Sequence, residues 1–156
     1  MVLINSNNGH ENWFDALSLW NRVYNWAHYK TSKRELQIQI KSLLIYLWNE
    51  KDWLKEQYPS KKEQVEQFIN KSTYIKIVGD LANTVKHRQL TKKPRSSVEQ
   101  TDYFGRITTG RGASRSLYYF LNIGDRKTVE IMEILRGTID EFEELKYLLA
   151  SQSLEK

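Results

Sequence analysis

The chain contains no cysteine, only three histidines and only two prolines among its 156 residues. The absence of cysteine excludes a disulfide framework, a thiolate metal site and a cysteine nucleophile, and it fits the reducing cytoplasm. His10, His28 and His87 lack the short spacing of zinc ligands, so we expect no metal site and no cofactor. Long hydrophobic runs are also absent: the longest, Leu43–Trp48, has six residues, whereas a membrane span needs roughly 18. We therefore expect a cytoplasmic protein without a membrane segment.

The size and composition are typical of one globular domain. Charged residues make up 28% of the chain and hydrophobic residues 40%, an ordinary balance for a folded protein. A domain of this length buries roughly 70% of the surface of its unfolded chain, so it needs no covalent staples. We expect residues 1–10 and 151–156 to be flexible and residues 11–150 to form the domain. Met1–Ile4 has no basic residue before it, so we expect no signal peptide.

The net charge of +5 is distributed unevenly along the chain. Residues 76–127 carry 11 basic and 4 acidic side chains, whereas residues 128–156 carry 3 basic and 7 acidic ones. A basic segment attracts phosphate groups because binding releases counterions. Two interpretations remain open: a phosphate-binding segment, or a basic surface segment that folds against the acidic last helix.

Apolar residues at spacings of three and four predict two long helices in the first third of the chain. The first helix is expected from about Glu11 to Tyr29. A capping box of Ser32 and Glu35 predicts the start of the second, which should end before Pro59 because the residue preceding a proline is pushed out of helical conformation. The first apolar stripe comprises Phe14, Leu17, Trp20 and Tyr24. The second comprises Leu36, Ile40, Leu43, Leu44, Leu47 and Trp48. We expect the tryptophans to pack the core: Trp13, Trp20, Trp26, Trp48 and Trp53.

The remainder of the chain predicts two shorter helices, a hairpin and a last long helix. A capping box of Ser60 and Glu63 predicts a third helix, and a fourth is expected over residues 74–89. The third helix should face inward with Val65, Phe68 and Ile69. After a basic linker, aromatic and β-branched residues predict a hairpin over residues 102–123 with a loop at 108–114. The last helix is expected to begin near Thr128. Its buried face comprises Ile131, Leu135, Ile139, Phe142, Leu145 and Leu149. Gly137 lies in its interior and predicts close packing there. The predicted fold is mainly α, a bundle of four to five helices with a small β-hairpin inserted before the C-terminal helix.

The fourth helix carries a polar stripe opposite its apolar face. Lys76, Asp80, Asn83 and His87 share this stripe at 100° per residue. His87 suits proton transfer near neutral pH, and Asp80 suits its orientation. Asparagine is a weak helix former, so an inert face would be better served by Glu or Lys. A solvated face and a catalytic stripe both remain open.

The stretch Asp80-x-x-Asn83-x-x-Lys86-His87 resembles the signature region of the HEPN superfamily, and it is also similar to uncharacterised bacterial proteins. The resemblance covers residues 11–91 in architecture. The family motif is an arginine, an asparagine, any three residues and a histidine. Asn83 and His87 match its asparagine and histidine. The resemblance implies a dimeric, metal-independent ribonuclease of toxin–antitoxin or defence systems, in which a ribose 2′-OH attacks the adjacent phosphodiester. The histidine moves the proton and the arginine stabilises charge on the phosphate. Ala82 stands at the arginine position here, so an electrostatic contribution on the order of 3 kcal/mol is missing.

The candidate site therefore combines two sets of residues. The catalytic set is Asp80, Asn83 and His87. The nucleic-acid-binding set comprises Lys86, Arg88, Lys92, Lys93, Arg95, Arg106, Arg111 and Arg115. Residues 103–119 combine arginine, glycine and tyrosine, which suits single-stranded nucleic acid through stacking and phosphate contacts.

These sets predict an RNA-directed helical protein, either a weak ribonuclease or an inactive nucleic-acid binder, with RNA and a second copy as partners. Whether it is an enzyme remains open. The alternative function is a non-enzymatic protein-interaction module. Glu141, Glu143 and Glu144 on the last helix are interpreted as a solvated face or as a complement to the basic segment.

Overall fold

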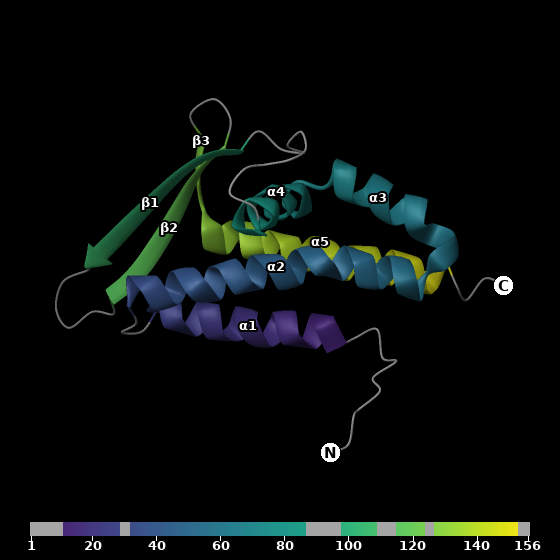
Figure 1. Cartoon of the computed structure of the whole chain (residues 1–156), viewed down its shortest axis with the longest axis horizontal. Coiled ribbons are helices and arrows are strands. Elements are labelled where there is room, and N and C mark those ends of the chain that lie inside the picture. The colour runs from purple at the N-terminus through teal and green to yellow at the C-terminus, as the bar shows by residue number, and fades with distance from the viewer. Residues whose placement is uncertain (1–10, 29–31, 87–97, 109–114, 124–126, 153–156) are drawn as a thin grey trace, which may run out of the picture.

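The computed structural model describes residues 11–28, 32–86, 98–108, 115–123 and 127–152, of which residues 26–28, 33, 86, 98–108, 115–123 and 127–128 are described by their backbone alone. The predicted fold class is confirmed: the chain is a mainly α helical bundle with strands inserted before the last helix (Figure 1). The helices are α1 (Glu11–His28), α2 (Lys33–Gln57), η1 (Pro59–Lys61), α3 (Lys62–Lys71), α4 (Ile75–Lys86) and α5 (Ile131–Ser151). The strands are β1 (Val98–Thr108), β2 (Arg115–Ile123) and β3 (Lys127–Glu130).

Helix α2 begins and ends as its sequence predicts. The Ser32 hydroxyl accepts a hydrogen bond from the Glu35 amide at 3.1 Å, which satisfies one of the amides left over at a helix start. The helix ends at Gln57, directly before Tyr58 and Pro59. The predicted apolar stripe is buried throughout, so α2 forms the central wall of the core: Leu36, Ile40, Leu43, Leu44, Leu47 and Trp48.

The predicted apolar stripe of α1 is confirmed only in part, because Leu17 and Trp20 pack partly buried against the core but the other two members do not. Phe14 and Tyr24 are 63% and 40% exposed, whereas Trp13, Ala16 and Val23 are buried. Spacings of three and four describe both sets equally well. Contacts of Trp13 with α5 decide between the two sets. Its ring packs edge-on against the buried Phe142, with 5.8 Å between the ring centroids, and its indole N–H donates a hydrogen bond to Glu143. These contacts turn the helix so that Phe14 faces outward.

The predicted capping box at Ser60 does not open the third helix. Pro59 begins a 3-10 turn that includes Ser60, and α3 starts at Lys62 with Lys61 as an N-cap that makes no side-chain capping bond. Proline suits the first position of such a turn because its φ is already fixed and its missing N–H would be unpaired there. The inward residues Val65 and Ile69 are nevertheless buried, as predicted.

The hairpin is present and is joined by a third strand that the sequence analysis missed. β1 pairs antiparallel with β2, and β2 pairs antiparallel with β3. Thr128 is therefore in a strand, opposite Asn122, and the last helix begins three residues later, at Ile131. β-branched residues at 128 and 129 favour this extended conformation, and pairing with β2 satisfies its backbone groups. The predicted buried face of the helix is confirmed in full.

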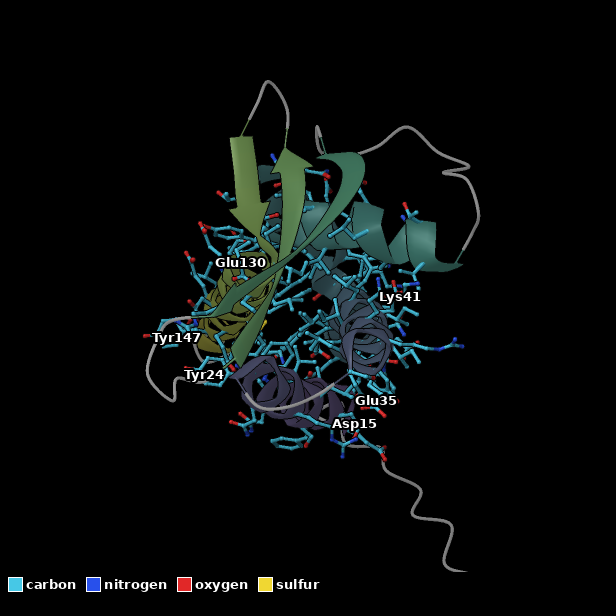
Figure 2. The ribbon with its side chains drawn as sticks, turned by 90° about the vertical axis from the view of Figure 1, so that its left-hand side faces the viewer. Asp15, Tyr24, Glu35, Lys41, Glu130 and Tyr147 are labelled. Carbon is cyan, nitrogen blue, oxygen red and sulfur yellow. The ribbon has the colours of Figure 1, made fainter. Side chains whose placement is uncertain are left out.

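The sheet lies at one end of the bundle, beside the start of α5 and the end of α1 (Figures 1 and 2). β2 contacts both α1 and α5, and β3 also contacts α5. Trp13 and Trp48 are buried, and Trp20 packs partly buried against the core, in agreement with their predicted role. Among the described residues, no helix has the length and apolar character to cross a membrane. The predicted flexible ends lie outside the described residues, apart from Ser151 and Gln152.

Candidate functional site

The polar stripe predicted on the fourth helix lies partly inside the protein. Helix α4 packs against α2 and α5, and its apolar face is buried as expected. Asp80 is also buried, at 5% exposure, although its stripe was expected to be accessible. Asn83 and Lys76 are half-buried. Lys86 ends the helix, and its side chain lies outside the described residues, as does all of His87. The structure therefore describes Asp80 and Asn83 of the predicted catalytic set.

The arginine position of the HEPN motif faces the core. Ala82 has no exposed surface and belongs to the same cluster of buried side chains as Val78 and Leu81. A guanidinium at this position would have to be desolvated among apolar groups, which carries a large free-energy cost. The packing around α4 therefore favours a small apolar residue such as alanine at position 82 over the arginine of the motif.

The start of α4 is held by a carboxylate from α5. Glu141 accepts hydrogen bonds from the amides of Thr73, Tyr74 and Ile75, with oxygen–nitrogen distances of 2.7 to 3.2 Å. These amides have no partner within a helix, and the negative charge is also favoured by the helix dipole. Glu141 therefore fixes where α4 begins, and with it the placement of Asp80 and Asn83. This role corrects the interpretation of Glu141 as a solvated residue.

Two glycines allow α4 to lie close to its neighbours. A Cβ at Gly79 would come within 2.6 Å of Cζ3 of Trp48, and a Cβ at Gly137 would overlap the ring of Tyr74. Ordinary carbon contacts are about 3.5 to 4 Å, so neither position has room for a side chain. The close packing predicted at Gly137 is confirmed. Tyr74, whose ring lies against Gly137, is the residue directly before α4.

The predicted nucleic-acid-binding residues fall mostly outside the described residues. Arg88, Lys92, Lys93, Arg95 and Arg111 lie there.

Two others have a described backbone position in the hairpin. Arg106 in β1 is opposite Leu117, and Arg115 in β2 is opposite Thr108. Because side chains alternate along a strand and directly opposed residues share a face, both arginines belong to one face of the hairpin. That face also includes the opposed pair Phe104 and Tyr119.

A buried polar cluster joins α1, α2 and α5, and the sequence analysis did not identify it. The carboxylate of Glu50 has no exposed surface, and its Oε1 lies 2.8 Å from Nζ of Lys146. Its Oε2 accepts a hydrogen bond from the Asn12 amide at 2.7 Å. Lys146 Nζ also lies 3.8 Å from the ring centroid of Trp13, whose indole N–H donates to Glu143 at 3.0 Å. Three helices are thereby tied together by polar contacts.

Burial and charge act in opposite directions on Lys146. Desolvation lowers the pKa of its ammonium group, and the carboxylates of Glu50 and Glu143 partly oppose that effect. The two charged groups of Glu50 and Lys146 lie at contact distance, so charge attraction holds the pair together. Thirty-eight residues separate Asn12 from Glu50, and no local pattern signals such a pairing.

Burial also raises the pKa values of two further groups, the Glu130 carboxyl and the Tyr74 phenol. Glu130, at the junction of β3 and α5 (Figure 2), has its pKa raised by burial and by Glu133. The amides of Met132 and Glu133 and the charge of Arg136 oppose that shift, although the side chain makes no capping hydrogen bond. The pKa of the Tyr74 phenol is raised by burial and by the neighbouring Glu133, to which it donates at 3.4 Å.

No candidate metal centre occurs in the described part of the chain, which contains no cluster of three or more His, Cys, Asp or Glu residues arranged to hold a metal ion. Comparisons with known proteins identify no match: no family model, no curated protein and no solved structure is similar to this chain.

Proposed function

We propose that this protein binds single-stranded RNA through its basic segment and hairpin, as an inactive relative of the HEPN type that does not cleave. The observation that carries the proposal is the use of the acidic residues on α5. Glu141 is occupied by the first amides of α4, and Glu143 accepts from the Trp13 indole. Both carboxylates are thus directed to neutral donors of α1 and of the start of α4, and the basic residues between 76 and 127 outnumber the acidic ones by 11 to 4, an excess that favours an external phosphate chain.

The hairpin brings arginine and aromatic residues to one face. Arg106, Arg115, Phe104 and Tyr119 share one face by the register of β1 and β2. Arginine contacts phosphate, and aromatic rings stack on bases without regard to sequence. Residues 103–119 contain three arginines and no acidic residue. This composition supports binding with little sequence preference.

Helix α4 lacks a cation that cleavage of this type would need. The motif arginine is replaced by Ala82, whose side chain is completely buried, so the cation that the family places on the phosphate has no equivalent there. Asp80 is buried, and we assign it a positioning role in the helix rather than contact with RNA. Asn83 and His87 then remain as the part of the catalytic set available for binding.

RNA binding can be tested by fluorescence anisotropy with a labelled single-stranded RNA of mixed sequence at several salt concentrations. We expect the logarithm of the binding constant to fall linearly with the logarithm of salt, with a slope near −0.7 for each phosphate contacted. Arg115→Ala should make that slope shallower by about 0.7. The matched control, Arg34→Ala, removes an exposed arginine side chain from α2 and should leave the slope unchanged.

The same samples test cleavage, because RNA incubated with protein and a metal chelator can be resolved on a gel. We expect intact RNA with the natural protein and with His87→Ala. Cleavage that disappears in His87→Ala would overturn the inactive assignment in favour of a ribonuclease. RNA retention that does not depend on salt, or no retention, would overturn RNA binding and favour the protein-interaction alternative.

A further inference from the structure

An arginine and a tyrosine are stacked at the end of the bundle that meets the sheet. The guanidinium carbon of Arg136 on α5 lies 5.8 Å from the ring centroid of Tyr24 on α1, within the range of a cation–π contact. Both side chains are exposed, and Tyr24 is 40% exposed although it supports the guanidinium. The pair therefore presents a cation on an aromatic support at the protein surface.

The position of this pair along its two helices places it beside the hairpin. Arg136 lies five residues after the start of α5 at Ile131, and Tyr24 lies four residues before the end of α1 at His28. β2 contacts both of these helices. Figure 2, which looks at the sheet end of the bundle, shows Tyr24 beside the lower end of the hairpin. An RNA strand bound along the hairpin therefore comes close to the pair.

Arg136 differs in charge from most of its helix. Residues 128–156 carry 3 basic and 7 acidic side chains, and Arg136 is the first of the three basic ones along the chain. The next, Lys146, is half-buried and pairs with Glu50, and Lys156 lies outside the described residues. An acidic helix repels a phosphate chain except where an exposed cation offsets its charge. A contact between RNA and the described part of α5 is therefore expected at Arg136.

We propose that Arg136 is a further phosphate-binding residue of the RNA site and that Tyr24 holds its guanidinium in place. The role assigned to Arg136 rests on the proposed RNA binding, and it adds a contact from the helical bundle to those of the hairpin. A guanidinium suits a phosphate because its N–H groups can bond to two oxygens at once. Stacking on the ring restricts the long side chain beforehand, so less conformational entropy is lost when the phosphate binds. Tyr24 is thus a positioning residue.

The salt dependence of RNA binding tests the role of Arg136, with labelled single-stranded RNA of mixed sequence and fluorescence anisotropy. Arg136→Ala should make the slope of the logarithm of the binding constant against the logarithm of salt shallower by about 0.7, because one phosphate contact is lost. Arg22→Ala is the matched control. It removes an exposed arginine of α1 that lies about 200° around the helix from Tyr24, and it should leave the slope unchanged.

The affinity at one fixed salt concentration tests the role of Tyr24. Tyr24→Ala should weaken binding about two- to fivefold, which is the contribution expected of an exposed cation–π contact. Tyr24→Phe keeps the ring and should restore the affinity. When Arg136→Ala is already present, adding Tyr24→Ala should cause no further loss, because no guanidinium remains to be held. A further loss in this double variant would contradict the positioning role.

Comparison of two arginines distinguishes a failure of this contact from a failure of RNA binding. A slope that changes in Arg115→Ala but not in Arg136→Ala would overturn the contact from α5 and leave the hairpin as the RNA site. No salt-dependent binding by the natural protein would overturn RNA binding itself, and the role of Arg136 with it. Circular dichroism establishes that each variant retains its helices.

Discussion

Glu50 and Lys146 form an ion pair in the interior of the bundle, with 2.8 Å between Oε1 and Nζ and with the Glu50 side chain completely buried. The pair joins α2 to α5, and Asn12 of α1 donates to the same carboxylate. Removing two charges from water is costly, so this contact is not a simple gain in stability. Its effect is to make the three helices depend on one another, because each partner is costly to leave alone.

Breaking this pair from one side should be strongly destabilising. Lys146→Met leaves the carboxylate of Glu50 buried without its cation, and we expect a loss of about 3 to 5 kcal/mol in the free energy of unfolding. The double variant Glu50→Leu with Lys146→Met should recover most of that loss, because no charge is then buried. Urea denaturation followed by circular dichroism measures both. As a control, Asp52→Asn removes an exposed partner of Lys51 and should change stability by less than about 1 kcal/mol. A single variant as stable as the natural protein would contradict the coupling.

Replacing Gly137 by alanine should destabilise the protein, although alanine favours a helix by about 1 kcal/mol over glycine. The added Cβ would overlap the ring of Tyr74, and overpacking of this kind costs about 1 to 3 kcal/mol. Thermal unfolding followed by circular dichroism should show a lower midpoint for Gly137→Ala. Asn21→Ala, on the exposed side of α1, is the helix control and should not lower it. A higher midpoint for Gly137→Ala would mean that the Tyr74 ring moves aside freely.

Removing the Glu141 carboxylate should loosen the start of α4. Glu141→Ala leaves the amides of Thr73, Tyr74 and Ile75 without their acceptor. Loss of a capping group typically costs about 1 to 2 kcal/mol. Hydrogen exchange of those three amides should accelerate, and urea denaturation should show the loss of stability. Glu144→Ala, an exposed glutamate of the same helix, should change stability by no more than about 0.5 kcal/mol. Equal effects of the two substitutions would refute the capping role.

The raised pKa of Glu130 predicts a pH dependence with a definite sign. A carboxyl whose pKa is raised above its ordinary 4.5 binds its proton more tightly in the folded state than in the unfolded state. Its stabilising contribution is present below pH 4.5 and is lost as the pH rises through the folded pKa. Glu130→Gln stays uncharged, so it should match the natural protein in acid and become more stable than it at neutral pH.

Urea denaturation at a series of pH values between 3 and 7, on the order of one pH unit apart, tests this sign. Glu144→Gln removes the same charge from an exposed position and serves as the control. An advantage of Glu130→Gln that is greatest in acid would show that the sign is reversed.

Short sequence patterns correctly predicted those features of the helices that depend on only a few neighbouring residues. The start of α2 at Ser32, its end before Pro59 and the buried face of α5 all follow from capping, proline geometry and helical period. The same rules failed in α1, where two different sets of apolar residues fit the helical period equally well. The stripe of α1 containing Phe14 and the stripe containing Trp13 have the same period, and only contact with α5 separates them.

At the candidate site, too, the helical period predicted the helix face of each residue, whereas tertiary packing decided its burial and its partners. Asp80 and Asn83 were placed on one helix face correctly by period, but the burial of Asp80 depends on the helices packed around α4. The cap supplied by Glu141 comes from a residue 66 to 68 positions away along the chain. No pattern within α4 records such a partner, because a backbone amide accepts any suitably placed carboxylate.

The sequence by itself determined the helical class, the insertion of the hairpin, the absence of thiol chemistry and the concentration of positive charge between residues 76 and 127. These properties depend on composition and on spacing within single elements. Only the tertiary structure decided that Glu50 meets Lys146, that Ala82 is in the core and that β1 forms an edge. Those outcomes depend on which elements pack together, and packing is settled by shape and desolvation over the whole molecule rather than by any short stretch of residues.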